Sequence, residues 1–155
     1  MIFLSLIWLL QDLVQLILMG ICMIPDVFLL TILFLALLPW KTRDDQSKLI
    51  WAAFIGGLLW DLRWTNLPGF TSAVGCGLVG AACIMWQKLP AIGRTPVAFM
   101  FISAACQLLY ALTHCFFWAM PSQSALRQFI VQQLIAVPVI IIFTLLYGRV
   151  SERDG

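Results

Sequence analysis

The stretch GGLLWDLRW, residues 56–64, joins an apolar helical run to an aspartate and an arginine. Two adjacent glycines begin it, and Asp61 and Arg63 follow within about two helical turns. The chain is almost wholly apolar from residue 49 up to the aspartate. This is typical of a helix that crosses a membrane and reaches the interface at its charged end. Similar apolar runs recur along the whole chain.

The composition places the chain in a membrane. Of its 155 residues, 63% are hydrophobic and 10% are charged, and the mean hydropathy is +1.01. Water-soluble domains are far less apolar. Since no soluble-sized polar segment separates the runs, we expect one all-α integral membrane domain over residues 1–155. The first run lacks the basic start and cleavage site of a signal peptide, so we expect it to remain as an anchor.

Breaks in the hydropathy divide the chain into six apolar segments. Pro25 and Asp26 form the first break, because a proline beside an aspartate favours the first turn of a helix over its interior. The sequence therefore predicts a six-transmembrane-helix bundle. Its helices cover about residues 2–22, 26–40, 49–61, 71–86, 96–118 and 127–147.

Lysine and arginine are concentrated on one side of this bundle. Seven of the nine lie in the loops and tails of that side, and the other side holds only Arg63 and Arg127. Because positive residues favour the cytoplasmic side, we expect both termini in the cytoplasm. The net charge of +2 is too small to indicate nucleic-acid binding.

Asp26, Asp61, Arg63 and Arg127 fall at the same end of the bundle if the six segments alternate in direction. Asp26 can cap the start of its helix. Asp61 lies at the C-terminal end of a helix, where the dipole is negative, and needs a donor from elsewhere. We expect Asp61 to pair with Arg127, with Arg63 as the competing partner. The alternative is a carboxylate that reaches into interfacial water.

Several polar side chains lie deeper within the predicted spans. Asp12 is the costliest, since an ionised carboxylate at the centre of a span is penalised by ~2.5–3.5 kcal/mol. It is expected to be protonated or bonded to a glutamine. One interpretation is a polar pocket or proton path; we prefer interhelical hydrogen bonds that fix the bundle. The other members of the set are Gln11, Gln15, Gln107, Gln132 and Gln133.

Small residues at four-residue spacing indicate close approach of the third and fourth helices. The series are Ala52 and Gly56, Ala53 and Gly57, Ala73 and Gly77, and Ser72, Cys76 and Gly80. The five cysteines lie within or beside apolar runs without a CxxC pair, which indicates free thiols. The single histidine, His114, gives no basis for a metal site, and no cofactor is expected.

The block PDVFLLTILFLALLPW, a short basic loop, and AAFIGGLLWDLRWTNLPGFTSA resemble the central part of the bacterial rod shape-determining MreD family. In that family a proline-led second span precedes a glycine-bearing third span that ends in aspartate-leucine, and a glycine precedes the fourth. The match covers about residues 24–82, and the last two helices match in hydropathy. The matching residues are Pro25, Gly56, Gly57, Asp61, Leu62 and Gly69.

This resemblance implies a non-enzymatic scaffold in the bacterial inner membrane that helps maintain rod cell shape. The implied partners are MreC, RodA with its transpeptidase partner, MreB indirectly, and membrane lipids. It also implies a fold similar to the substrate-binding subunits of energy-coupling-factor vitamin transporters. The residues expected to pack the bundle or contact partners are Pro25, Asp26, Gly56, Gly57, Asp61, Arg63, Gly69, Gly77 and Arg127.

The sequence leaves two other functions open. The chain could be such a transporter subunit, with Trp60, Trp64, Phe70 and Trp118 near one face to stack a ligand, although tryptophans near helix ends are expected as interface anchors. An aspartate-dyad protease using Asp26 and Asp61 is less favoured. It would lack the surrounding motif of such enzymes, and both aspartates have structural explanations.

Overall fold

A computed structural model describes residues 2–18, 24–39, 42–64, 69–117 and 122–153. This part of the chain is all-helical, without strands, and contains the six expected helices. Their bounds are α1, Ile2–Ile17; α2, Val27–Ala36; α3, Arg43–Trp64; α4, Phe70–Lys88; α5, Pro96–Phe117; and α6, Ser122–Arg153. A single 3₁₀ turn, Ala91–Gly93, separates α4 from α5.

Several helix ends differ from the predicted ones. The charged loop expected before residue 49 forms the first turns of α3, where the Thr42 hydroxyl accepts from the Asp45 amide at 3.3 Å. Asp44 and Asp45 lie in this first turn, where the positive end of the helix dipole favours acidic side chains. α6 is longer than expected at both ends, and Pro138 lies inside it. α1 ends at Ile17, and the rest of the predicted segment, residues 19–22, lies outside the described residues.

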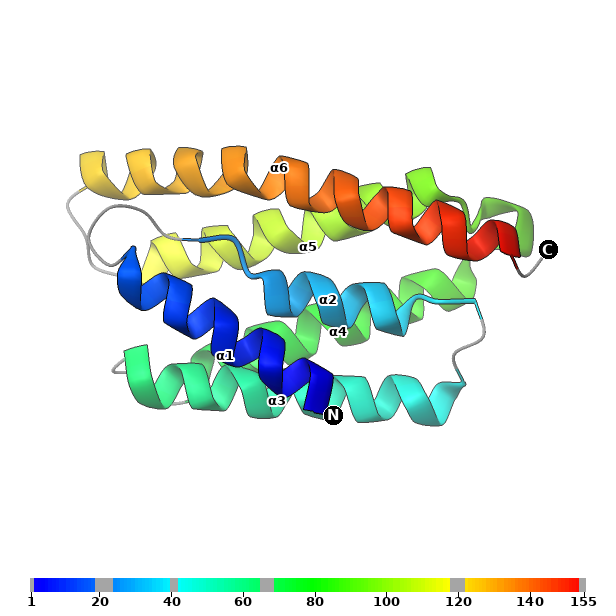
Figure 1. Cartoon of the computed structure of the whole chain (residues 1–155), viewed down its shortest axis with the longest axis horizontal. Helices are drawn as coiled ribbons and strands as arrows, with labels where there is room; N and C mark the ends of the chain where they lie inside the picture. Colours follow the sequence, from blue (N-terminus) through cyan, green and yellow to red (C-terminus); the bar gives the residue numbers. More distant parts are fainter. Residues whose placement is uncertain (1, 19–23, 40–41, 65–68, 118–121, 154–155) are drawn as a thin grey trace.

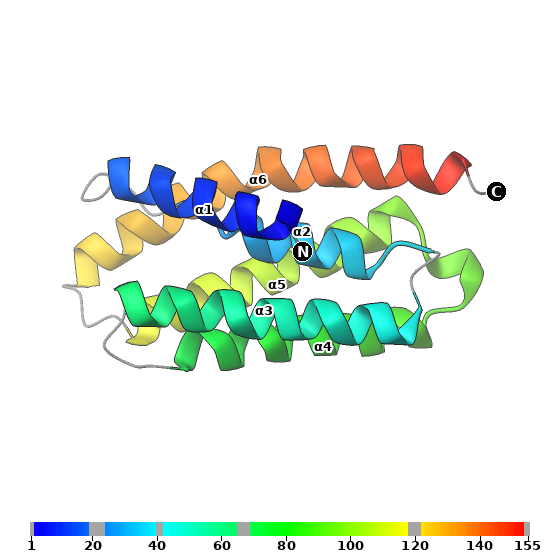
Figure 2. The same ribbon diagram turned by 60° about the horizontal axis from the view of Figure 1, so that its bottom comes forward.

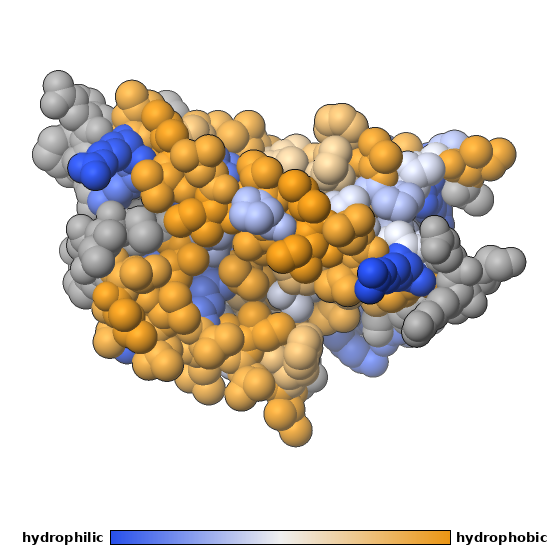
Figure 3. Space-filling model, turned by 45° about the horizontal axis from the view of Figure 1, so that its top comes forward, coloured by the Kyte–Doolittle hydropathy of each residue, from blue (hydrophilic) through white to orange (hydrophobic). Residues whose placement is uncertain are grey.

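Three helices are long and apolar enough to cross a membrane: Phe70–Lys88, Pro96–Cys115 and Leu126–Ser151. α1 and α2 are shorter apolar helices. Large apolar side chains are exposed along α1, α3, α5 and α6. Figure 3 shows the resulting apolar surface, with the most hydrophilic residues mostly toward the two ends. A surface of this kind is suited to lipid and would be a liability in water.

The helices alternate in direction. The starts of α2, α4 and α6 and the ends of α1, α3 and α5 lie at one end of the bundle (Figure 1). Asp26, Asp61, Arg63 and Arg127 belong to those helix ends, as the sequence predicts. We call this the charged end.

α2 is the centre of the bundle and packs against each of the other five helices. Its surface is apolar on all sides, and a helix of that kind is stable only when it is surrounded. Leu30, Ile32 and Leu33 are fully buried. Figure 2 shows this short helix enclosed by the longer ones. At 10 residues it is about 15 Å long, so it occupies only part of the thickness of the bundle.

α1 has the reverse polarity of a helix in a soluble protein. Its buried residues include Asp12 and Gln15, whereas Leu6, Leu10 and Leu13 are exposed. Its apolar side chains therefore face outward, and its polar side chains face the other helices. This arrangement is typical of a helix that contacts lipid on one side and forms interhelical hydrogen bonds on the other.

Candidate functional site

α3 and α4 form the most extensively packed hairpin of the bundle, and Gly57 is the residue that lets them meet. A Cβ added there would lie 2.6 Å from the Ser72 Cα and 2.7 Å from its amide nitrogen. These are backbone atoms, so no change of rotamer could relieve the clash. The Ser72 hydroxyl also donates to the Phe54 carbonyl at 3.0 Å. Gly57 is therefore a packing requirement of the hairpin.

Asp61 lies one turn beyond Gly57 on the same face of α3 and caps the start of α4. Its carboxylate accepts from the Thr71 amide at 2.9 Å and from the Ser72 amide at 3.3 Å. The residue that precedes α4 is Gly69, whose φ is +89° and which has no side chain to cap the helix. A neighbouring helix therefore supplies the anion that the exposed amides and the dipole favour. The carboxylate is fully buried, at 0% exposure, and does not reach into interfacial water.

Arg63 forms an ion pair with Asp12 of α1. The Asp12 side chain is 5% exposed and that of Arg63 is 48% exposed, so the arginine brings a partly hydrated charge to a buried carboxylate. This pair differs from the sequence-based expectations, in which Arg63 competes for Asp61 and Asp12 is protonated or bonded to a glutamine. Arg127 lies exposed at the start of α6, and the expected ion pair between Asp61 and Arg127 is not formed between these two described residues.

Gln11 joins α1 to the start of α2. Its amide nitrogen donates to the Asp26 Oδ1 at 3.1 Å, and its carbonyl oxygen accepts from the Phe28 amide at 2.7 Å. Asp26 also accepts from the Leu29 amide at 2.9 Å, which makes it the cap of α2 that the sequence predicts. Tyr110 of α5 lines the same small cavity as Gln11 and Asp26.

Two further glutamines hold the segment before α2. The Gln15 carbonyl oxygen accepts from the Ile24 amide at 3.1 Å, and the Gln132 amide of α6 donates to the Ile24 carbonyl at 3.2 Å. Pro25 is fully buried beside them. For Gln11, Gln15 and Gln132 the polar groups therefore serve as links between helices, as preferred from the sequence. Such links avoid unsatisfied groups in hydrocarbon.

Gln107 and Ser103 differ from these glutamines. They lie one turn apart on α5, and Gln107 is 0% exposed. Among the described residues, neither the Gln107 amide atoms nor the Ser103 hydroxyl has a hydrogen-bond partner.

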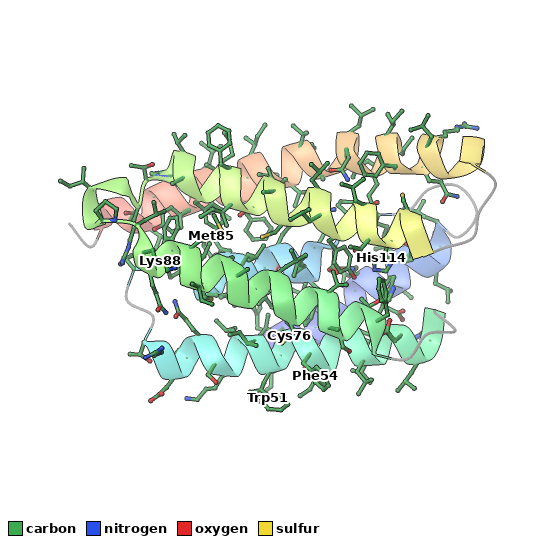
Figure 4. The ribbon with its side chains drawn as sticks, turned by 180° about the vertical axis from the view of Figure 1, so that it is seen from behind. Trp51, Phe54, Cys76, Met85, Lys88 and His114 are labelled. Carbon is green, nitrogen blue, oxygen red and sulfur yellow. The ribbon has the colours of Figure 1, made fainter. Side chains whose placement is uncertain are left out.

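His114 is buried near the end of α5, within reach of α4. Its Nε2 lies 3.5 Å from the Thr71 hydroxyl, and its ring contacts Tyr110 at 4.6 Å between centroids. Figure 4 shows His114 at the charged end of α5. Within the described part of the chain, no three His, Cys, Asp or Glu side chains gather as metal ligands would. Thr71 and Tyr110 carry no sequence signal of their own, because only packing brings them to the aspartates.

A small cavity and a larger groove adjoin the charged end. A cavity of about 20 Å³ is lined by Gln11, Asp26, Trp60, Thr71 and Tyr110, among others. A larger groove of about 310 Å³ lies between α1 and α3 and is almost wholly apolar. Trp8, Phe28 and Gly56 line both, so the groove and the cavity are neighbours.

Gly56 and Gly77 have opposite surroundings. A Cβ at Gly56 would clash with the Phe28 ring, and the Gly56 carbonyl accepts from the Trp8 indole at 3.1 Å. A Cβ at Gly77 would meet nothing within 4 Å. An alanine at position 56 would therefore force the Phe28 ring to move, whereas nothing in the described fold explains the glycine at position 77.

Family models, curated proteins and solved structures were each compared with the chain, and none matches it. Its functional interpretation therefore depends on the residues. At the charged end, two carboxylates cap the starts of α2 and α4, and a third pairs with the arginine at the end of α3.

Proposed function

We propose that this protein is an MreD-like scaffold of the machinery that elongates the cell wall in rod-shaped bacteria. It binds MreC within the inner membrane, and through it the RodA synthase with its transpeptidase partner, and MreB. In this proposal all six helices traverse the membrane, both termini are cytoplasmic, and the fold is similar to that of energy-coupling-factor substrate-binding subunits.

The residues that resemble the MreD family support the proposal because they pack or cap helices of the bundle. Gly57 and Asp61 fix the α3–α4 hairpin, and Gly69 precedes α4 with a positive φ. Asp26 caps α2 directly after Pro25. A shared scaffold would keep these residue types, since each meets a packing or capping need that few other residues can meet.

The observation that carries the proposal is the open face of α4. Ala73, Gly77 and Ala81 follow one another at four-residue spacing, and all three are exposed. Helix-interior glycine costs about 1 kcal/mol relative to alanine, yet open space surrounds Gly77 and Gly80. Glycines that the chain itself does not need are explained by a partner helix that packs closely, as small-residue faces do in membranes.

The surroundings of this face leave room for such a helix. α4 lies between α3 and α5, and Trp51 and Phe54 project from α3 on the side away from α4 (Figure 4). A single transmembrane helix of MreC laid along α4 would contact backbone at the glycines. Dispersion contacts and weak Cα–H to carbonyl hydrogen bonds would then hold it, since lipid gives no hydrophobic preference between helices.

The transporter alternative is less well supported. Small-molecule sites typically measure ≈300–1,000 Å³ and carry a few polar groups that orient the ligand. The polar cavity at the charged end measures about 20 Å³, and the neighbouring groove of about 310 Å³ is almost wholly apolar. A vitamin-sized ligand would have to displace Trp60 or Tyr110 from the cavity.

Affinity purification of the tagged protein from its own host, in mild detergent and after crosslinking, tests the proposal. Recovery of MreC with RodA supports the scaffold function. Recovery of an energy-coupling-factor ATPase module, or of neither, would overturn it. Gly77→Ile should remove MreC, whereas the control Ala105→Ile, on the exposed face of α5, should retain it. Loss of MreC from both or neither variant would place the contact elsewhere.

A further inference from the structure

The groove between α1 and α3 opens at the outer surface of the bundle. Leu9, Ile55 and Leu59 form its rim, and their exposed fractions are 57%, 50% and 45%. Ser5 is the only side chain in its lining with a hydroxyl, and Trp8 closes one end through its hydrogen bond to Gly56. The full lining is Leu4, Ser5, Trp8, Leu9, Phe28, Ala52, Ile55, Gly56 and Leu59.

The groove exists because α1 is held to α3 at two points and packs mainly on α2. Trp8 bonds to Gly56, and one turn further along α1, Asp12 pairs with Arg63. These two contacts fix α1 and α3 in a parallel alignment. On the N-terminal side of Trp8, Leu4 and Ser5 line the groove from α1, and the small side chain of Ala52 forms part of its floor.

The volume limits what can enter. The groove measures about 310 Å³, and its almost wholly apolar lining suits an extended hydrocarbon chain. If the groove stayed empty, its apolar walls would lose their dispersion contacts.

A cationic group stands at the same end of the groove as Leu59. Arg63 follows Leu59 by one helical turn, about 6 Å, and faces α1, as its pairing with Asp12 shows. A guanidinium has five N–H donors and binds phosphate well. The Arg63 side chain is 48% exposed, so an anion in the interface can reach it while the Asp12 pair persists.

We propose that this groove is a phospholipid site, with one acyl chain between α1 and α3 and the phosphate beside Arg63. This assignment is independent of the scaffold function. The bound chain would complete the contact between α1 and α3 that the protein leaves open, so lipid would determine how firmly α1 is held.

The test uses the whole protein in vesicles of phosphatidylethanolamine and phosphatidylglycerol that contain a phospholipid with a diazirine in its acyl chain. After irradiation, peptide mapping gives the labelled positions as the mole fraction of probe is raised. We expect saturable labelling around Leu9, Ile55 and Leu59, and labelling of the outer face of α6 that rises in proportion to the probe. Proportional labelling at the groove would overturn the proposal.

Ala52→Phe fills the floor of the groove and should abolish the saturable labelling, and Ala105→Phe on the exposed face of α5 should leave it unchanged. Leu9→Trp narrows the rim from α1 and provides a second blocking variant if Ala52→Phe does not elute as a single species. Saturable labelling that persists in a folded blocking variant would refute the site.

The phosphate contact is tested separately. Asp12→Asn with Arg63→Gln replaces the ion pair by a neutral one and should raise the half-saturating probe fraction roughly ten-fold, equivalent to about 1.4 kcal/mol. An unchanged half-saturation would refute the contact with Arg63. If the groove is labelled only after MreC is stripped away, partner side chains occupy it, and the lipid assignment is wrong.

Discussion

Gly57→Ala is the substitution that most directly tests how the α3–α4 hairpin is built. The new methyl group would lie 2.6 Å from the Ser72 Cα and 3.0 Å from the Thr71 carbonyl carbon. Overpacking of this kind typically costs about 1–3 kcal/mol. Displacement of α4 would also lengthen the bonds from Asp61 to the Thr71 and Ser72 amides, and hydrogen bonds to charged groups contribute about 1.5–3 kcal/mol. Alanine regains about 1 kcal/mol of helix propensity.

The expected net loss is about 2–3 kcal/mol in the free energy of unfolding. Gly77→Ala is the matched control. It introduces the same methyl group into α4 where nothing lies within 4 Å, and it should stabilise the protein by up to about 1 kcal/mol. The two variants therefore carry the same chemical change with opposite expected signs.

The assay is unfolding by sodium dodecyl sulfate in mixed micelles, followed by circular dichroism, with each variant compared at equal detergent composition. A double-mutant cycle with Asp61→Asn links the clash to the cap, because removal of the charge should cost less once α4 has moved. Equal shifts for Gly57→Ala and Gly77→Ala, or strict additivity with Asp61→Asn, would refute this account of the hairpin.

Three further predictions concern neighbouring contacts and use the same unfolding assay. Asp61→Ala should lower the free energy of unfolding by about 2–3 kcal/mol, because the first amides of α4 lose a charged acceptor. A decrease smaller than that of an exposed substitution would contradict the capping of α4 by Asp61. Arg63→Gln should cost about 3 kcal/mol by stranding the buried Asp12 carboxylate, whereas Asp12→Asn should cost less than about 1 kcal/mol; equal losses would count against the pair. Gly56→Ala should destabilise through its clash with the Phe28 ring, and Phe28→Leu should recover part of the loss, whereas additive losses would exclude that contact.

The charged end illustrates how far residue types can be interpreted without coordinates. The sequence predicts that Asp26 caps its helix, because an aspartate beside a helix-starting proline needs only local backbone to do so. It also indicates that Asp61 requires a donor from elsewhere. The donors are backbone amides at the start of α4. A backbone donor cannot be predicted from the pattern of side chains.

Arg63 and Arg127 show why charge pairing could not be assigned in advance. Both lie at the same end, and alternation of helix direction is enough to say so. Which of them meets a buried carboxylate depends on how α1 leans over α3, and that angle is set by the packing of Trp8, Phe28 and Gly56.

The sequence by itself determined that the chain suits apolar surroundings, that it is helical, and how many helices it forms. These properties follow from hydropathy, length and breaks along the chain. Tertiary structure alone decided which helix is central, which glycines are required, and where the groove opens. α2 has the same apolar character as its neighbours, and Gly57 and Gly77 are identical in type. Their difference arises only from the atoms that other helices place beside them, and burial and contact are properties of that arrangement.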